Sequence, residues 1–235
     1  MKKLTILLLL LYANILFAAR PLKSNDAFTL GSNIFQIEFS SDIFHSDNRY
    51  LLSLPLVFTF GISTQSDLFF ASSFLTNSNS CEGSYIDCLD IGIKQNISSS
   101  KVFNFAFLSG LSSSVVESKF SSPTAFFCII STLLFDNISL HYNLGYNQNF
   151  EKQEFKDLWF VSIGVEYFLS DILNLATDFG IGRDPSIHCS TPQSYSLFGF
   201  SYFLFHNFSV DSGISFSFQH FTRIDLITIG FTLSI

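Results

Sequence analysis

The stretch ISLHYNLGYN, which begins at Ile138, alternates between apolar and polar side chains at every residue. Because successive side chains of a β-strand point to opposite faces, this period of two predicts a strand with one apolar and one polar face. A soluble sheet would bury the apolar face in a core. A membrane barrel would do the reverse, with apolar side chains turned outward to lipid and polar side chains turned inward.

The same alternation recurs in segments of about ten residues, a length typical of tilted strands that cross a bilayer. The regular segments are LDIGIKQN from Leu89, VFNFAFLSGLS from Val102, WFVSIGVEY from Trp159, LNLATDFGIG from Leu173, FSVDSGISFSF from Phe208 and ITIGFTLSI from Ile227. The less regular ones are NIFQIEFS from Asn33, LLSLPLVFTFGI from Leu51, LFFASSFL from Leu68 and YSLFGFSYFLF from Tyr195. TAFFCIISTLLF from Thr124 is apolar on both faces, so its register is unreadable. Together they predict about twelve strands, with ten or fourteen as alternatives.

The links between these segments alternate between short and long. The short links are TQSD at Thr64, SSSK at Ser98, FDN at Phe135, LSD at Leu169 and FHN at Phe205. The longer links run around His45 to Asn48 and onward from Thr76, Val116, Asn147, Gly182 and Gln219. Outer-membrane barrels have short periplasmic turns and longer outer loops, so both termini are expected on the periplasmic side.

The composition favours the membrane interpretation. Hydrophobic residues make up 48% of the chain and charged residues only 13%, which is about half the share usual in soluble domains. The apolar strand faces carry almost no charge, whereas a soluble protein would need charges on its outward faces. The predicted fold class is therefore all-β, a transmembrane antiparallel up-and-down β-barrel over residues 33–235. We expect it in the outer membrane of a bacterial cell, with outer-membrane lipid around it.

The N-terminus has the pattern of an export signal. Lys2 and Lys3 precede an apolar run over residues 4–17, and small residues at 18 and 19 offer a cleavage site. We predict a signal peptide over residues 1–19, with an uncleaved membrane anchor as the alternative, and an N-terminal periplasmic segment over residues 20–32. Cleavage would leave 10 basic and 19 acidic side chains, a net charge of −9. An acidic chain is a poor partner for nucleic acid, so none is expected.

The stretch FTFGISTQSDLFFASSFL from Phe58 resembles the outer-membrane barrel family of phenol-degradation meta-pathway (MetA-pathway) channels. Members of that family typically have a glycine before a short turn and an acidic residue that opens the next strand. Gly61 and Asp67 stand at these positions, with the turn at residues 63–66. IDCLDIGIKQNI from Ile86 is similar to the family's strand after the first long loop, with Cys88 where glycine is usual.

The final hairpin also resembles the family's closing pair of strands, including Asp211 and the pair Gly230 and Phe231. The resemblance implies a twelve-stranded barrel that passes small solutes, hydrophobic ones among them. It also implies the barrel assembly machinery as a partner, which reads a C-terminal Phe in most such barrels; Ile235 stands there in this chain.

Charged residues within the predicted strands share a phase with Ser, Gly, Asn or Thr, which places them on the inward face. The candidate lumen-lining residues are Glu38, Asp90, Lys94, His141, Glu166, Asp178 and Asp211. One interpretation is a cation-preferring passage, because rings of carboxylates favour cations. The other is a set of hydrogen-bonded pairs, for example with Lys94, that fill and close a narrow barrel.

Catalytic and metal-binding motifs are weak in this sequence. A hydrolase would need a Ser–His pair oriented by a third polar group, and His141 alone does not establish one. His188 and Cys189 lack any further metal-ligating partner motif. We therefore expect no enzyme activity, no cofactor and no metal. Cys81 and Cys88 bracket one outer loop and are predicted as a disulfide, with free thiols or a Cys81–Cys189 cross-link as alternatives.

The function that these patterns favour is a channel or passive transporter for small solutes. Two alternatives remain at the level of the sequence. One is an outer-membrane lipid-modifying hydrolase such as a lipase or deacylase. The other is a structural or adhesive barrel whose outer loops carry the activity.

Overall fold

The structure is a computed structural model that describes residues 22–46, 49–77, 85–116, 119–120, 123–150, 158–183, 193–217 and 224–235. None of these residues belongs to a helix that is long and apolar enough to cross a membrane. The strands in chain order are β1 (Phe35–Ser46), β2 (Arg49–Ser63), β3 (Ser66–Asn77), β4 (Tyr85–Ser99), β5 (Phe103–Val116), β6 (Lys119–Phe120), β7 (Thr124–Phe135), β8 (Ile138–Asn149), β9 (Leu158–Ser170), β10 (Leu173–Gly182), β11 (Gln193–Phe205), β12 (Phe208–Ser217) and β13 (Ile224–Ser234).

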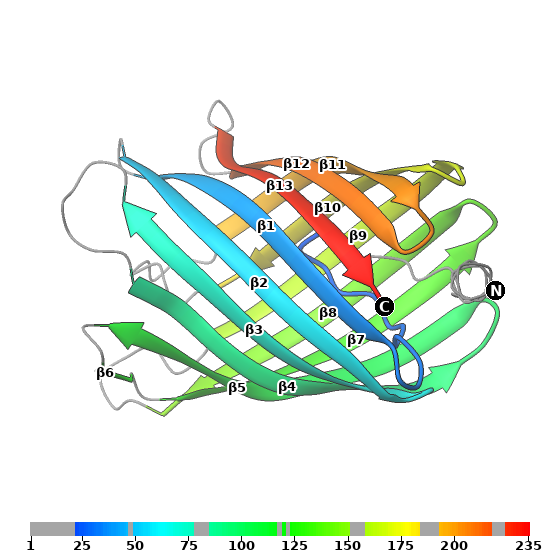
Figure 1. Cartoon of the computed structure of the whole chain (residues 1–235), viewed down its shortest axis with the longest axis horizontal. Helices are drawn as coiled ribbons and strands as arrows, with labels where there is room; N and C mark the ends of the chain where they lie inside the picture. Colours follow the sequence, from blue (N-terminus) through cyan, green and yellow to red (C-terminus); the bar gives the residue numbers. More distant parts are fainter. Residues whose placement is uncertain are drawn as a thin grey trace, which may run out of the picture.

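The long strands close into one antiparallel barrel. Each pairs with its neighbours in the chain, β5 pairs with both β4 and β7, and β1 pairs with β13 to complete the circle (Figure 1). The two-residue strand β6 only extends β5, so the barrel itself has twelve strands and the predicted number is confirmed. The closure is continued past β13, because the amides of Phe35 and Ile235 donate to each other's carbonyl oxygens at 2.9 and 2.7 Å.

The side chains alternate as the sequence predicts, with polar residues inside. On β8, His141 and Asn143 are 1% and 2% exposed, whereas their neighbours Tyr142 and Leu144 are 40% and 54% exposed. Each of the twelve barrel strands carries exposed large apolar side chains on its outer face. An apolar belt around a polar interior is stable in hydrocarbon, where a closed barrel also leaves no unpaired strand edge.

The lengths of the links differ between the two ends of the barrel. At one end the turns are 64–65, 100–102, 136–137, 171–172 and 206–207, and β1 begins and β13 ends beside them. We call this the short-turn end. At the other end most links are longer, as predicted, with one correction. The link around His45 to Asn48 is short, because β1 and β2 extend to residues 46 and 49 and leave only two residues between them.

The register of β7, which its sequence leaves open, is set by packing inside the barrel. Phe127 and Ile129 face outward and are 45% and 39% exposed. Cys128 and Ile130 face inward and form a small apolar cluster with Ala106 of β5 and Ala27, a residue that precedes the barrel. The middle of the inward face of β7 is apolar because it contacts a piece of chain rather than solvent.

Ile163 lies on the outer face near the middle of β9 and is 41% exposed. The substitution Ile163→Arg places a charge against lipid, and we expect it to lower the free energy of unfolding by about 2–4 kcal/mol. The matched variant Ile163→Val keeps the face apolar and should cost under about 1 kcal/mol. Denaturant titration of the protein folded in lipid vesicles measures both. Equal stability of the two variants would contradict a lipid-facing position.

Candidate functional site

A stretch of chain from the N-terminal side of the barrel lies inside it. The sequence predicts residues 20–32 as a periplasmic segment, whereas the structure places residues 22–30 against inward-facing side chains of the wall. We call residues 22–30 the inner segment; Figure 1 draws it in dark blue within the barrel. Ser24 and Ala27 are 1% and 0% exposed, so the inner segment is buried by its surroundings rather than resting at the barrel mouth.

The inner segment leaves the lumen at the short-turn end through a tight crossing. The amide of Asn33 donates to the carbonyl oxygen of Gly61, and the amide of Gly61 donates to that of Ile34, each at 2.8 Å. Gly31 has a φ of 92°, a conformation that favours glycine. A Cβ atom on Gly61 would lie 1.7 Å from the carbonyl oxygen of Gly31. Gly61, one of the residues that carries the family resemblance, is therefore required for this close approach.

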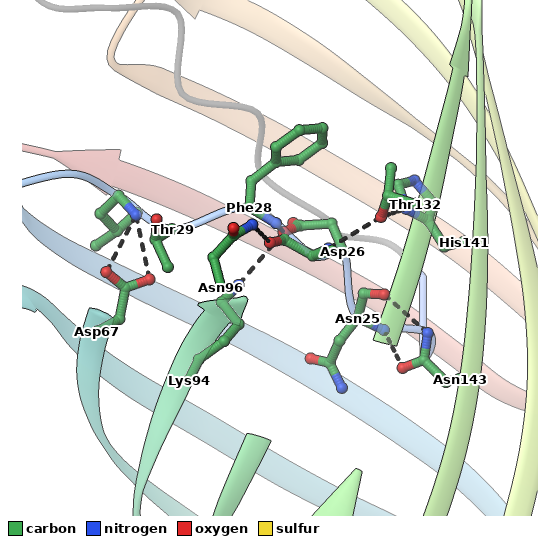
Figure 2. A network of polar contacts seen from close by, with 12 residues as sticks. Asn25, Asp26, Phe28, Thr29, Asp67, Lys94, Asn96, Thr132, His141 and Asn143 are labelled. Atoms are coloured by element: carbon green, nitrogen blue, oxygen red, sulfur yellow. Dashed lines mark hydrogen bonds and ion pairs between the residues drawn. The ribbon is translucent and has the colours of Figure 1, made fainter. Parts of the chain in front are cut away.

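Side chains of the wall bind the middle of the inner segment through its main chain (Figure 2). The Asn143 side chain accepts from the amide of Asn25 at 2.9 Å and donates to its carbonyl oxygen at 2.8 Å. Thr132 accepts from the amide of Ala27 at 2.9 Å, and Asn96 donates to the Ala27 carbonyl oxygen at 2.7 Å. These contacts satisfy main-chain groups that would otherwise be buried without partners.

Carboxylates bind the two ends of the inner segment. Asp178 accepts from the amide of Ser24 and, at 2.9 Å, from its hydroxyl group, which lies 2.7 Å from the Ser162 hydroxyl oxygen. Both carboxylate oxygens of Asp67 lie 3.1 Å from the amide of Leu30. Carboxylates thus hold Ser24 and Leu30, so the inner segment is attached to the wall at both ends.

A buried chain of hydrogen bonds positions Thr132 behind the inner segment. The Thr132 hydroxyl group lies 3.0 Å from Nδ1 of His141, whose Nε2 lies 3.3 Å from Oε2 of Glu166. Asn174 donates to Oε1 of Glu166 at 3.2 Å. The arrangement contains a hydroxyl, an imidazole and a carboxylate, but the Thr132 oxygen is 0% exposed and already accepts from the Ala27 amide. Its geometry serves to orient Thr132 toward the inner segment.

The rest of the lumen contains a cavity of about 930 Å³, with the inner segment on one side of it. Its charged lining residues are six carboxylates and two ammonium groups: Asp26, Glu38, Asp42, Asp67, Asp90, Asp211, Lys23 and Lys94. Lys94 forms an ion pair with Asp26 of the inner segment at 3.3 Å. The lining therefore has an excess of negative charge.

Two aromatic rings form an apolar part of the cavity wall. Phe69 of β3, Gly92 of β4, Gly110 of β5 and Phe126 of β7 lie in one row across the sheet. A Cβ atom on Gly92 would lie 2.5 Å from the Phe69 ring, and one on Gly110 would lie 2.4 Å from the Phe126 ring. The glycines thus let both rings lie over the strands, with centroids 6.1 Å apart. We call these four residues the aromatic shelf.

The structure divides the predicted lumen residues into two groups. Glu38, Asp90, Lys94 and Asp211 line the cavity. His141, Glu166 and Asp178 are buried beneath or against the inner segment, at 1%, 3% and 0% exposure. Cys81 falls outside the described residues, so its disulfide with Cys88 stays a prediction.

Several site residues were missed by the sequence reasoning. Asp42 lines the cavity and accepts from the Thr228 hydroxyl group at 2.6 Å. Asn96, Thr132 and Asn143 bind the inner segment. Asn143 and Asn96 do occupy polar positions of strongly alternating segments, which is the signal that could have found them. Nothing in the sequence pairs them with residues 22–30.

No protein-family model and no curated protein matches the sequence. Solved structures resemble it in fold. The KdgM porin has a TM-score of 0.59 at 11% identity, covering 85% of this chain and 99% of that one. It was also solved in complex with disordered oligogalacturonate. An outer membrane channel from Pseudomonas putida F1 has a TM-score of 0.62 at 8% identity, covering 94% of this chain and 100% of that one. The NanC porin has a TM-score of 0.59 at 8% identity, covering 84% of this chain and 97% of that one.

The substitution Asn143→Leu removes both hydrogen bonds to Asn25 and should loosen the inner segment. We expect the amides of residues 24–27 to exchange at least ~5-fold faster, because two neutral hydrogen bonds contribute roughly 1–3 kcal/mol. Hydrogen exchange followed by mass spectrometry measures this. Ser215→Ala, a buried wall residue on β12, is the matched control. Unchanged exchange in Asn143→Leu would show that the wall side chain does not hold the inner segment.

Proposed function

We propose that this protein is a passive channel for small solutes in the bacterial outer membrane. The observation that carries the proposal is a closed barrel with an apolar outer face and a polar inner face, which encloses a cavity of about 930 Å³. The fold shared with porins and an outer membrane channel supports it. On this proposal residues 1–19 direct export, and the barrel assembly machinery inserts the mature chain.

The charge of the cavity favours cations over anions. Six carboxylates against two ammonium groups line it, and one of the ammonium groups is engaged by Asp26. Oligogalacturonate, found with the KdgM porin, is a chain of carboxylated sugars and would be repelled by such a lining. We therefore propose a different class of solute for this chain, although the barrel is of the same kind.

The aromatic shelf narrows the class of solute further. Asp90 lies two residues from Gly92 on the same face of β4, about 7 Å along the strand. A carboxylate beside aromatic rings that line the cavity suits an organic cation that has an apolar portion, since rings attract both cations and apolar groups. This retains in part the passage of hydrophobic solutes that the meta-pathway family resemblance implies.

The inner segment restricts the passage in this proposal. It occupies the lumen from the short-turn end to the level of Tyr195, whose ring lies 4.1 Å from the Lys23 ammonium group. Solutes would move through the remaining cavity past Lys94 and Asp26. The barrel would then conduct weakly while the inner segment is in place.

The charge preference is tested in planar lipid bilayers with a salt gradient. We expect the wild-type protein to favour cations. The triple variant Glu38→Gln/Asp90→Asn/Asp211→Asn should lower the cation-over-anion permeability ratio by at least ~5-fold, since about 1 kcal/mol of lost attraction corresponds to that factor. Asp136→Asn, at an exposed turn, is the control with a single charge change outside the cavity. Anion preference, or no conductance at all, would contradict the proposal.

The role of the inner segment is tested by removing its main-chain donors. In the variant Ser24→Pro/Ala27→Pro, the amides that donate to Asp178 and Thr132 are lost. We expect single-channel conductance to rise severalfold. The variant Phe28→Ala changes a side chain of the same segment and keeps every hydrogen bond that the segment donates to the wall, so its conductance should stay near wild type. An unchanged current in the proline variant would contradict an obstructing segment.

A further inference from the structure

The contacts that hold the inner segment would also suit peptides of other sequences. We propose that the inner wall of β3, β4, β7, β8 and β10 is a binding site for extended oligopeptides, which it recognises through their main chain. The ligand class is a neutral or cationic peptide of about nine residues, with a small side chain at one position. This inference does not depend on whether the barrel conducts ions.

Main-chain recognition accounts for most of the contacts. The amides of Ser24, Asn25, Ala27 and Leu30 all donate to wall side chains. The carbonyl oxygens of Asn25 and Ala27 accept from wall side chains as well. Any peptide that follows the same path presents the same six groups, whatever its side chains.

The wall supplies these contacts because a closed barrel has no free strand edge. Peptides commonly bind by adding a strand to an exposed sheet edge, where main-chain groups give the affinity. Here the edges of β1 and β13 are paired with each other. The Asn143 side-chain amide accepts from and donates to the main chain of Asn25, as a residue of an edge strand would. Thr132 and Asn96 do so together for Ala27.

Side-chain requirements are confined to a few positions. Ala27 is 0% exposed and packs against Ala106, Cys128 and Ile130, which leaves room for a small residue only. Asp26 meets Lys94 at 3.3 Å. By contrast Lys23 is exposed, and Phe28 and Thr29 are partly so. The Thr29 hydroxyl group, however, donates to the carbonyl oxygen of Thr64 at 2.9 Å. The site is therefore selective at the Ala27 position and permissive at 23 and 28.

Charge sets the preference for neutral or cationic peptides. Asp178 and Asp67 stand at the two ends of the site, and the adjoining cavity has excess carboxylates. Lys94 is the one ammonium group of the wall that contacts the inner segment among the described residues. A peptide rich in acidic residues would bring like charges together on entry, which costs binding free energy.

The native inner segment competes with any added peptide. Because it is tethered to β1, its effective concentration at the site is on the order of millimolar. A free peptide therefore binds measurably only when the tethered segment is weakened. The full-length variant Ser24→Pro/Ala27→Pro achieves this while the wall stays unaltered, and folding of its barrel is checked by the heat-dependent shift on a gel.

The experiment measures binding of fluorescently labelled peptides to this variant in detergent by anisotropy. The first peptide, LKSNDAFTL, copies residues 22–30. The second changes the residues at positions 23 and 28 and keeps the rest. The third keeps the native sequence but carries N-methyl groups at the Asn25 and Ala27 positions. We expect the first two to bind within about 3-fold of each other and the third at least ~10-fold more weakly, since it lacks two donors.

Wall variants in the same proline background complete the test. Asn143→Leu should weaken the native peptide at least ~10-fold, whereas Ser215→Ala should leave it unchanged. Thr132→Val serves in place of Asn143→Leu if the latter does not fold. A second peptide as weak as the N-methylated one would overturn the proposal, because the wall would then read this sequence alone. Absence of saturable binding by the native peptide would overturn it too.

Discussion

The need to pair every main-chain amide and carbonyl group away from water governs this structure. In hydrocarbon such groups find partners only in neighbouring strands, so the sheet closes on itself through β1 and β13. Closure and the two-residue period of strands together fix which side chains face lipid and which face inward. The paired main chain of the barrel leaves polar side chains of the inner face available for other partners.

The same requirement explains the inner segment. Its main chain is buried but forms no ladder with a strand, so side chains must supply the partners. Asn143, Thr132 and Asn96 do this in the middle, and carboxylates do so at the ends. The buried chain from His141 to Glu166 and Asn174 then satisfies the groups behind Thr132. In this part of the lumen, the inward-facing polar residues hold the inner segment in place rather than line a water-filled pore.

The sequence was sufficient to predict the barrel, but it did not predict that the inner segment lies inside the lumen. Strict alternation identified the inward phase of β8 and β9, because burial on one face and lipid on the other demand it. It failed on β7, where Ile130 and Cys128 are apolar and yet inward, since they pack on Ala27. It gave no sign that residues 22–30 enter the lumen. That segment has no period of its own, and its hydrogen-bond partners are 35 to 154 residues distant in the chain.

The crossing of Gly31 and Gly61 has a consequence for the order of assembly. The inner segment is joined directly to β1, the strand that closes the barrel with β13. Its partners lie between the β2–β3 turn and β11, and the strands of that region can pair with one another before the seam forms. The segment can then settle on a still open sheet and be enclosed when the first and last strands meet. No free end has to be pulled through a finished ring, which keeps the topology free of threading.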